Sequence, residues 1–195
     1  MNPEITERQK EIINVSLEII AEGGIQALTI KNLANKIGFA ESAIYRHYKN
    51  KIQILLAILE FFKQNSESFF TSQLNSTEPS SVIIEHLFLN HFKKFSATPS
   101  LVAVIFSEEI FRNEVELTDK VKEIMDKNIT SLKTIIENGQ SKGEFRADIN
   151  SSHLSVMIMG SLRMFVKQWH MSGHKFSLIE KGSEFINSIN LLIKN

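Results

Sequence analysis

Apolar residues recur at a helical spacing from near the start of the chain. The first stripe consists of Ile12, Ile13, Leu17 and Ile20, and it follows the 3.6-residue period of an α-helix. Before it, Thr6 and Gln9 have the spacing of a capping box, which satisfies backbone N–H groups at a helix start. The glycines at positions 23 and 24 are typical of a helix end. The pattern therefore predicts a first helix between Thr6 and this glycine pair.

The same period and the turn residues between stripes predict further helices. Thr29 suits the N-cap of a short helix that ends at Gly38. Pro79 and Pro99 follow polar breaks, and each suits the first turn of a new helix. Helices are expected at residues 30–37, 41–47, 79–96, 100–111, 117–140, 151–172 and from 177 to near 193, with a long helix after Lys51. The predicted fold class is all-α, with about nine helices.

Composition agrees with this class and excludes several others. The chain has 22 Lys and Arg against 22 Asp and Glu, so it carries no uniformly basic coat for nucleic acid. It has no cysteine, which excludes disulfides, thiolate metal sites and cysteine catalysis. No uncharged stretch approaches the roughly 18–20 residues of a membrane span, and the first residues lack a signal-peptide pattern. We therefore expect a cytoplasmic protein with no membrane partner.

Aromatic residues are distributed unevenly along the chain. Of the 14 phenylalanines, only Phe39 precedes residue 50. This shift predicts two domains, a compact three-helix module at residues 1–50 and a larger helical bundle at residues 51–195.

The segment TIKNLANKIGFAESAIYRHYKNK, residues 29–51, predicts a helix-turn-helix. Its apolar positions face inward at helical spacing, and they are Leu33, Ala34, Ile37 and Ile44. Gly38 can adopt the left-handed conformation that the tight turn requires. Residues 31–51 hold five basic side chains against Glu41, a net charge of +4, whereas residues 1–30 hold two basic against five acidic, a net charge of −3. The second helix of such a motif presents its solvent face to the DNA major groove, and the basic strip of residues 31–51 would lie on this reading surface.

This segment resembles the TetR family of transcriptional regulators. The resemblance rests on Thr29, Leu33-Ala34, Ile37-Gly38, Ile44-Tyr45-Arg46-His47-Tyr48 and Lys51. A weaker similarity continues through Ile136–Gly139, Gly143–Arg146 and Asp148. The resemblance implies a DNA-binding module followed by a ligand-binding and dimerisation body.

The resemblance also implies which residues contact DNA: Thr29, Lys31, Glu41, Ser42, Ala43, Tyr45, Arg46, His47 and Lys51. Lysines 31 and 51 would bind phosphates, residues 41–43 would reach base edges, and residues 45–47 would contact phosphates and flanking bases. Glu41 could accept from a cytosine amino group or could stabilise the helix N-terminus. Ala40 stands where the family often has a capping serine, and Tyr48 suits a core position beside Leu33.

Aromatic and methionine residues of the C-terminal body suggest an apolar site. The candidates are Phe88, His91, Phe92, Phe95, Phe106, Met125, Met157, Phe165 and Trp169. Such residues either pack a core or line a concave pocket, and His91 could be a polar anchor or a satisfied core histidine. The resemblance implies that a ligand bound here shifts the fourth helix. A hydrophobic or amphipathic effector is expected, and no cofactor.

The last two predicted helices carry broad apolar stripes. Their candidate interface residues are Leu154, Ile158, Leu178, Phe185, Ile186 and Ile189. The stripes could be buried within one chain or could form a homodimer seam, and the resemblance implies a four-helix interface between two chains.

Other constellations predict no chemistry. His170 and His174 have the spacing of a metal pair, but Gly173 is expected to end the helix between them, so no metal site is predicted. Glu108 and Glu109 fit either a solvated face or a ligand contact. No catalytic pair and no glycine-rich phosphate loop is present, so the chain is not expected to be an enzyme.

The sequence thus predicts a TetR-type repressor, a homodimer that binds pseudo-palindromic double-stranded DNA and is released by a small apolar ligand. One alternative is a TetR-like nucleoid-associated factor that acts through a protein partner in chromosome organisation or division. A second alternative, a helical carrier of apolar ligands, leaves the basic strip of residues 31–51 unexplained.

Overall fold

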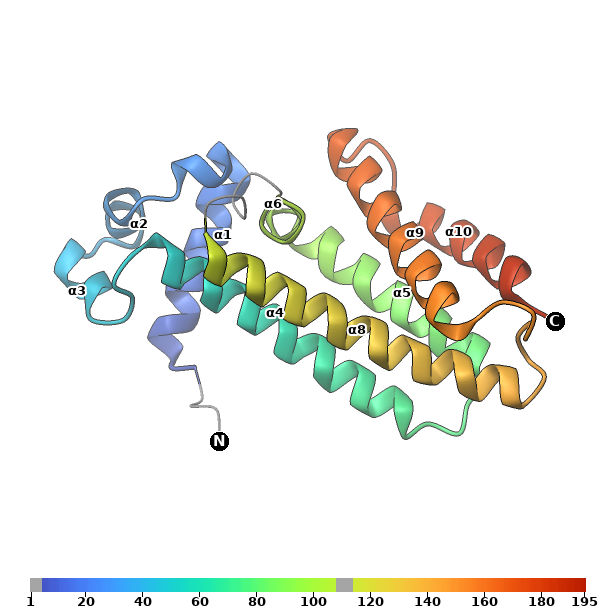
Figure 1. The fold of residues 1–195 in the computed structure, drawn as a ribbon. Coiled ribbons are helices and arrows are strands. Elements are labelled where there is room, and N and C mark those ends of the chain that lie inside the picture. Colours follow the sequence, from blue (N-terminus) through green and yellow to red (C-terminus); the bar gives the residue numbers. More distant parts are fainter. Residues whose placement is uncertain (1–4, 108–113) are drawn as a thin grey trace. The chain divides into compact units, whose positions relative to one another are not determined.

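The computed structural model describes residues 5–107 and 114–195, which form helices joined by short turns (Figure 1). The helices are α1 (Glu7–Ala27), α2 (Ile30–Ile37), α3 (Glu41–Tyr45), α4 (Lys51–Leu74), α5 (Ser80–Ala97), α6 (Ser100–Ile105), α8 (Val115–Ser141), α9 (Ser151–Met171) and α10 (Leu178–Ile193). Within the described ranges, β-structure is limited to a single bridge between Phe145 and Lys194. The all-α class is confirmed. Glu108 and Glu109 lie outside the described residues.

Short-range capping explains where several helices begin. In α1, the Thr6 hydroxyl accepts from the Gln9 backbone N–H at 3.2 Å, and the Gln9 side-chain Oε1 accepts from the Thr6 backbone N–H at 3.0 Å. Both bonds of the predicted capping box are therefore present. Gly24 lies inside α1 with a φ of 73°, and the helix resumes as far as Ala27. The glycine pair therefore kinks α1 and does not end it.

The chain divides into two compact units. The first comprises the chain up to Phe62 together with Thr98–Val121, and the second comprises Lys63–Ala97 and Lys122–Asn195. The sequence predicts a boundary at residue 50, whereas this division falls inside α4 and assigns Thr98–Val121 to the first unit. In the first unit α6 packs on α1, so a segment from the middle of the chain joins the N-terminal helices. None of the described helices combines the length and the apolar character that a membrane crossing requires.

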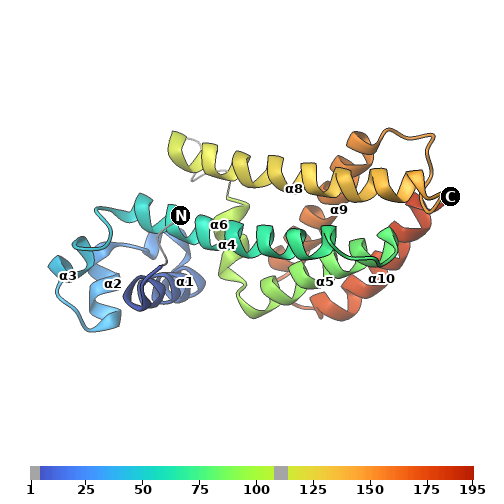
Figure 2. The ribbon, with the colours of Figure 1, turned by 90° about the horizontal axis from the view of Figure 1, so that it is seen from below.

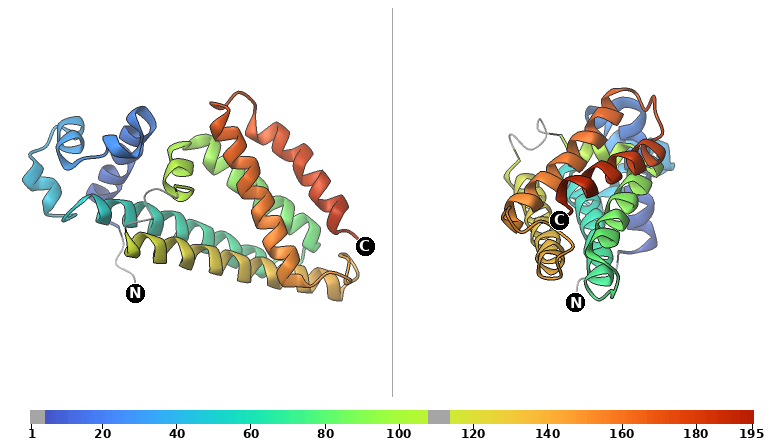
Figure 3. Two further views of the ribbon diagram at one scale, coloured as in Figure 1. Left: turned by 45° about the horizontal axis from the view of Figure 1, so that its top comes forward. Right: turned by 90° about the vertical axis from the view of Figure 1, so that its right-hand side faces the viewer.

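The second unit is built on α5, which packs against α10 and, less extensively, against α9 (Figures 2 and 3). Gly182 of α10 permits the close approach of α10 to α5. A Cβ atom at this position would lie 2.3 Å from two ring carbons of Phe92. Because van der Waals contact needs more than 3 Å, only glycine fits here without movement of the ring.

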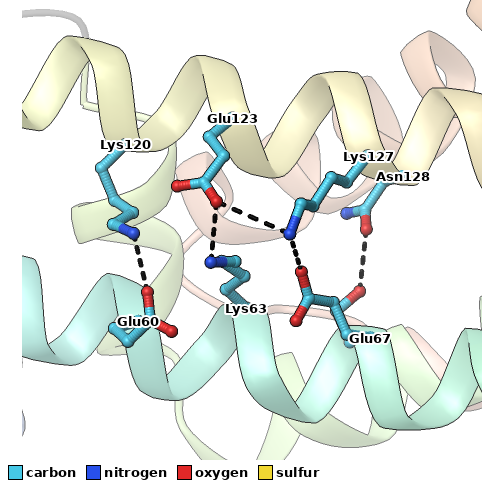
Figure 4. Close-up of polar contacts among 8 residues, drawn as sticks. Glu60, Lys63, Glu67, Lys120, Glu123, Lys127 and Asn128 are labelled. Atoms are coloured by element: carbon cyan, nitrogen blue, oxygen red, sulfur yellow. Dashed lines mark hydrogen bonds and ion pairs between the residues drawn. The ribbon is translucent and has the colours of Figure 1, made fainter. Parts of the chain in front are cut away.

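A ladder of three ion pairs joins the middle of α4 to the first half of α8 (Figure 4). The pairs are Glu60–Lys120 at 2.7 Å, Lys63–Glu123 at 2.7 Å and Glu67–Lys127 at 2.5 Å. The Ser66 hydroxyl also donates to the Asn128 side-chain oxygen at 3.0 Å. The sign of the charge alternates along each helix, so sliding one helix by one turn would place like charges opposite each other. The ladder therefore fixes the register of α4 on α8.

Candidate functional site

The α2–turn–α3 segment forms the predicted helix-turn-helix. Leu33, Ala34 and Ile44 are fully buried, and they hold α2 and α3 together in the first unit. Gly38 caps α2 with a φ of 83°, and its N–H donates to the Ala34 carbonyl at 2.9 Å. The Thr29 hydroxyl accepts from the Asn32 N–H at 3.0 Å, so Thr29 acts as the predicted N-cap.

The predicted DNA-reading residues of α3 are mostly accessible. The exposed ones are Glu41, Ser42, Tyr45, Arg46 and His47, and Ala43 is half-buried. Tyr45 is 50% exposed, whereas Tyr48 is 7% exposed, so the core position predicted for Tyr48 is confirmed. Burial also raises the pKa of Tyr48. Ala40 precedes α3 and makes no side-chain cap, as the sequence predicts.

Fewer unpaired basic side chains lie on this surface than the sequence predicts. Lys36 pairs with Glu22 of α1 at 2.5 Å and lies 3.7 Å from Glu18. The hydrogen bond to Glu22 raises the pKa of Lys36 above its usual value. The exposed cations near α3 that are not paired with an acidic side chain are Lys31, Arg46 and Lys49. The net charge of residues 31–51 overstates the charge presented to a ligand, because α1 neutralises one lysine.

Lys51 has an intramolecular partner. It is the first residue of α4, it is half-buried, and its ammonium donates to the Ile25 carbonyl at 2.6 Å. Burial lowers the pKa of Lys51. An ammonium has three N–H donors, so this bond leaves donors for a phosphate. Lys51 therefore links the end of α1 to the start of α4 and remains compatible with the predicted phosphate contact.

Two features near this surface are not predicted by the helix-turn-helix motif of residues 29–51. Asn50 accepts from the Gln53 N–H at 3.0 Å, and Gln53 accepts from the Lys49 N–H at 2.8 Å, which caps α4. The Asn-x-x-Gln spacing is a readable signal for this cap. The Arg8 guanidinium lies 4.4 Å from the centroid of the Phe39 ring, which anchors the α2–α3 turn to α1. No local sequence signal predicts that second contact.

Four aromatic rings form a cluster in the second unit. Phe88 and Phe92 of α5 contact each other at 5.9 Å between centroids, and Phe92 contacts Phe165 of α9 at 5.6 Å. Phe165 stacks on Phe185 of α10 at 4.5 Å, with an interplanar angle of 8°. We call these four residues the phenylalanine cluster. The sequence predicts three of them for the ligand site and Phe185 for the dimer seam.

Two further candidates for the ligand site are buried beside polar backbone groups. His91 lies with Nδ1 2.8 Å from the Leu87 carbonyl, and its ring is 6.1 Å from that of Phe95. Burial lowers the pKa of His91 to about 4, so its ring is neutral at pH 7. Trp169 is buried and donates from Nε1 to the Phe176 carbonyl at 3.0 Å.

The remaining candidates for the ligand site lie elsewhere. Met125 and Met157 are 42% and 57% exposed, so they are surface residues of the chain and not part of the buried aromatic core. Phe106 belongs to the first unit, whereas the phenylalanine cluster belongs to the second. The helical period could not distinguish these residues from the buried ones. It shows which residues share a face of a helix, but not what packs against that face.

The predicted seam residues are mostly buried by their own chain. These are Leu154, Ile158, Leu178, Ile186 and Ile189, while Phe185 is half-buried in the phenylalanine cluster. The five buried residues stabilise the second unit and are not accessible to a partner. The exposed apolar residues of α9 and α10 are instead Val156, Met157, Met164, Met171, Ile179, Leu191 and Leu192. Gly160 lies among them on α9, and a Cβ atom there would meet nothing within 4 Å.

Two family models match almost the whole described chain. Residues 12–58 match the model described as "Bacterial regulatory proteins, tetR family", and residues 60–194 match "YsiA-like protein, C-terminal region" of the TetR series. The chain belongs to the TetR family. It is a TetR-family transcriptional regulator, as the helix-turn-helix residues predict.

Individual relatives support the same assignment. The "Fatty acid metabolism regulator protein" of Bacillus subtilis is 28% identical over 171 residues, which cover 87% of each chain. The "Nucleoid occlusion factor SlmA" of Haemophilus influenzae is 24% identical over 172 residues, covering 84% of this chain and 77% of the relative. The first relative is named as a regulator and the second as a nucleoid occlusion factor, and neither name describes an enzyme.

Solved structures share the fold. FadR from Bacillus halodurans superposes with a TM-score of 0.82 at 23% identity, covering 96% of this chain and 94% of that one. FadR from Bacillus subtilis in complex with stearoyl-CoA superposes with a TM-score of 0.78 at 24% identity, covering 94% and 96%. At these identities the similarity establishes the fold alone.

Proposed function

We propose that this TetR-family regulator is a cytoplasmic repressor. It binds a pseudo-palindromic operator as a homodimer, and a long-chain acyl-CoA or a similar amphipathic molecule releases it. The observation that carries the DNA-binding half is the exposed face of α3, where Glu41, Ser42, Tyr45 and His47 are accessible above a buried apolar core. Side chains in these positions can reach base edges in the major groove.

Exposed cations around α3 supply the contacts that do not depend on base sequence. Lys31 lies in the first turn of α2, Arg46 caps the end of α3, and Lys49 precedes α4. Lys51 contributes a phosphate contact while it keeps its bond to Ile25. Glu41 is exposed at the first position of α3, and there it serves either a cytosine amino group or the helix N-terminus.

Replacing Lys31 with alanine should weaken binding to all operator sequences by a similar factor. A dimer loses two phosphate contacts, so the slope of log affinity against log salt should become shallower by about 1.8, at roughly 0.9 per contact. The measurement is a fluorescence anisotropy titration at several salt concentrations, on a duplex selected from a random pool. The Lys181→Ala variant, in the second unit, is the matched control and should keep the wild-type slope. Equal slopes for all three proteins would contradict the proposed phosphate contact.

We propose that the homodimer uses the exposed apolar side of α9 and α10. Met157, Gly160 and Met164 follow one side of α9 at helical spacing, and Leu191 is exposed on α10. Gly160 leaves room for a partner helix, because nothing of its own chain lies within 4 Å of a Cβ there. Two chains joined in this way would present two α3 helices to successive major grooves, about 34–36 Å apart or a multiple of that distance. The complex on a selected duplex should therefore contain two chains.

The effector half of the proposal rests on the phenylalanine cluster. Its rings contact one another, so an acyl chain would enter by separating the half-buried Phe165 and Phe185, whose stack is the exposed edge of the cluster. A buried aromatic lining with few polar groups suits an alkyl chain. The similarity to regulators of fatty acid metabolism supports this ligand class.

Stearoyl-CoA should raise the melting temperature and weaken operator binding by about 5–150-fold, the range of typical allosteric couplings. Affinity should rise steeply with acyl length, because each buried methylene contributes about 0.8 kcal/mol. Acetyl-CoA and free CoA are the matched controls. Operator DNA should in turn weaken stearoyl-CoA binding by the same factor.

Two outcomes would reject this effector. If acetyl-CoA acts as strongly as stearoyl-CoA, the acyl chain is not the recognised group. If no acyl-CoA changes operator affinity and binding sites are scattered over the chromosome, the protein is a nucleoid-associated factor, the alternative that the 24% identical relative favours.

A further inference from the structure

Two histidine rings meet at the C-terminal end of α9. His170 lies in the last turn of the helix, and His174 lies three residues beyond its end. The Nδ1 atom of His170 is 3.2 Å from the Nε2 atom of His174, and the ring centroids are 5.3 Å apart. The sequence predicts that the helix end separates these two residues. The structure brings them together.

A left-handed turn positions His174. Gly173 has a φ of 67° and His174 has a φ of 62°, and His174 is the only non-glycine residue with positive φ among the described residues. The His174 N–H donates to the Trp169 carbonyl at 3.1 Å, and the Gly173 N–H donates to the His170 carbonyl at 3.1 Å. The Ser172 hydroxyl accepts from the Lys175 N–H at 3.2 Å. These bonds stabilise a backbone conformation that residues other than glycine seldom adopt.

Trp169 holds the His174 ring from a second direction. The two ring centroids lie 4.3 Å apart, at an interplanar angle of 38°. Trp169 is itself buried and is anchored by the bond from its Nε1 to the Phe176 carbonyl. The His174 ring is therefore in contact with a fixed indole and with His170, so the relative position of the two imidazoles is defined before any ligand arrives.

The nitrogen separation suits a shared metal ion. Two nitrogens each about 2.0–2.1 Å from a tetrahedral zinc ion lie about 3.3–3.4 Å apart. The observed 3.2 Å is close to that value. Within residues 5–107 and 114–195, no third His, Cys, Asp or Glu joins the pair in a potential metal-binding cluster.

We propose that His170 and His174 form a two-nitrogen site for a divalent transition-metal ion that imidazole prefers, such as Zn²⁺, Ni²⁺ or Cu²⁺. Water fills the other coordination positions. The proposal does not rest on the proposed operator or effector. A hydrogen bond between the two rings would give a similar nitrogen distance without binding a metal, and the experiment separates these cases.

The chain contains a single tryptophan, and it is the residue that contacts His174. Nickel bound by the pair should therefore quench the intrinsic fluorescence of the full chain. We expect saturable quenching at one ion per chain, reversed by EDTA. His170→Gln and His174→Asn should each weaken nickel binding at least about tenfold, the loss typical when even an outer partner of a metal-bound histidine is removed. Asparagine tolerates a positive φ and so preserves the turn.

His86→Gln is the matched control. His86 is half-exposed on α5, where Nδ1 lies 3.3 Å from Glu78, and its removal should leave the quenching unchanged. Circular dichroism and melting temperatures establish that the three variants fold as the wild type does. The proposal is overturned if wild-type fluorescence shows no saturable quenching up to millimolar nickel, in which case the rings share only a hydrogen bond. It is equally overturned if His170→Gln or His174→Asn binds nickel as the wild type does.

Discussion

Replacing Glu123 with methionine should lower the free energy of unfolding by about 2–3 kcal/mol. Replacing its ion-pair partner Lys63 with methionine should cost less. The Lys63 side chain is only 11% exposed, and its ammonium lies 2.7 Å from the Glu123 carboxylate (Figure 4). The substitution removes that carboxylate from beside a cation in a poorly hydrated position. Lys63→Met instead removes the buried charge and keeps an apolar stem. Glu123 remains 38% exposed and lies 3.6 Å from Lys127, so this variant should lose less than about 1 kcal/mol.

Urea unfolding measures both variants, with the midpoint compared at constant m-value. Glu67→Met is the control from the same ladder, because its partner Lys127 is 51% exposed, and its cost should not exceed about 1 kcal/mol. Equal losses from Glu123→Met and Lys63→Met would show that burial of the ammonium does not determine the energetics of the ladder.

Replacing Gly182 with alanine should destabilise the protein by about 1–2 kcal/mol, although alanine is the better helix former by about 1 kcal/mol. The added Cβ would lie 2.3 Å from Phe92, whose ring is enclosed by Phe88 and Phe165. Overpacking of this kind costs about 1–3 kcal/mol and here should exceed the gain in helix propensity. In a chain of this size the melting temperature should fall by about 2–8 °C.

Ser183→Ala is the matched control on the same helix, because Ser183 is exposed and the change improves helix propensity without a clash. Combining Gly182→Ala with Phe92→Leu should recover part of the loss if the ring is the obstacle. Strictly additive effects of the two substitutions would place the strain elsewhere.

The first part of the chain illustrates what local sequence can predict. Thr6 with Gln9 caps α1, Thr29 caps α2, and Gly38 ends α2 in a left-handed conformation, all as the sequence predicts. Each feature involves residues at most four positions apart, so backbone geometry alone determines the partners. The helical period likewise predicts the other helices, and the motif at residues 29–51 identifies the TetR family.

The charge of the helix-turn-helix surface and the accessibility of the apolar stripes could be determined only from the tertiary structure. Lys36 pairs with Glu22, 14 residues away, which reduces the basic surface that a charge count predicts. Leu154 and Ile186 lie on apolar stripes that suit a dimer seam, yet their own chain buries them. A stripe predicts that a face is covered, and it carries no information about which surface covers it.

The sequence by itself determined the all-α class, the helix starts set by caps, the helix-turn-helix segment and the family. The tertiary structure alone decided the ladder of α4 and α8, the contact of Arg8 with Phe39 and the meeting of His170 with His174. The first two bring together side chains 31 to 60 residues apart, and the third depends on a left-handed turn at a histidine. Local patterns specify which conformation each segment prefers, whereas the packing of helices determines which side chains meet.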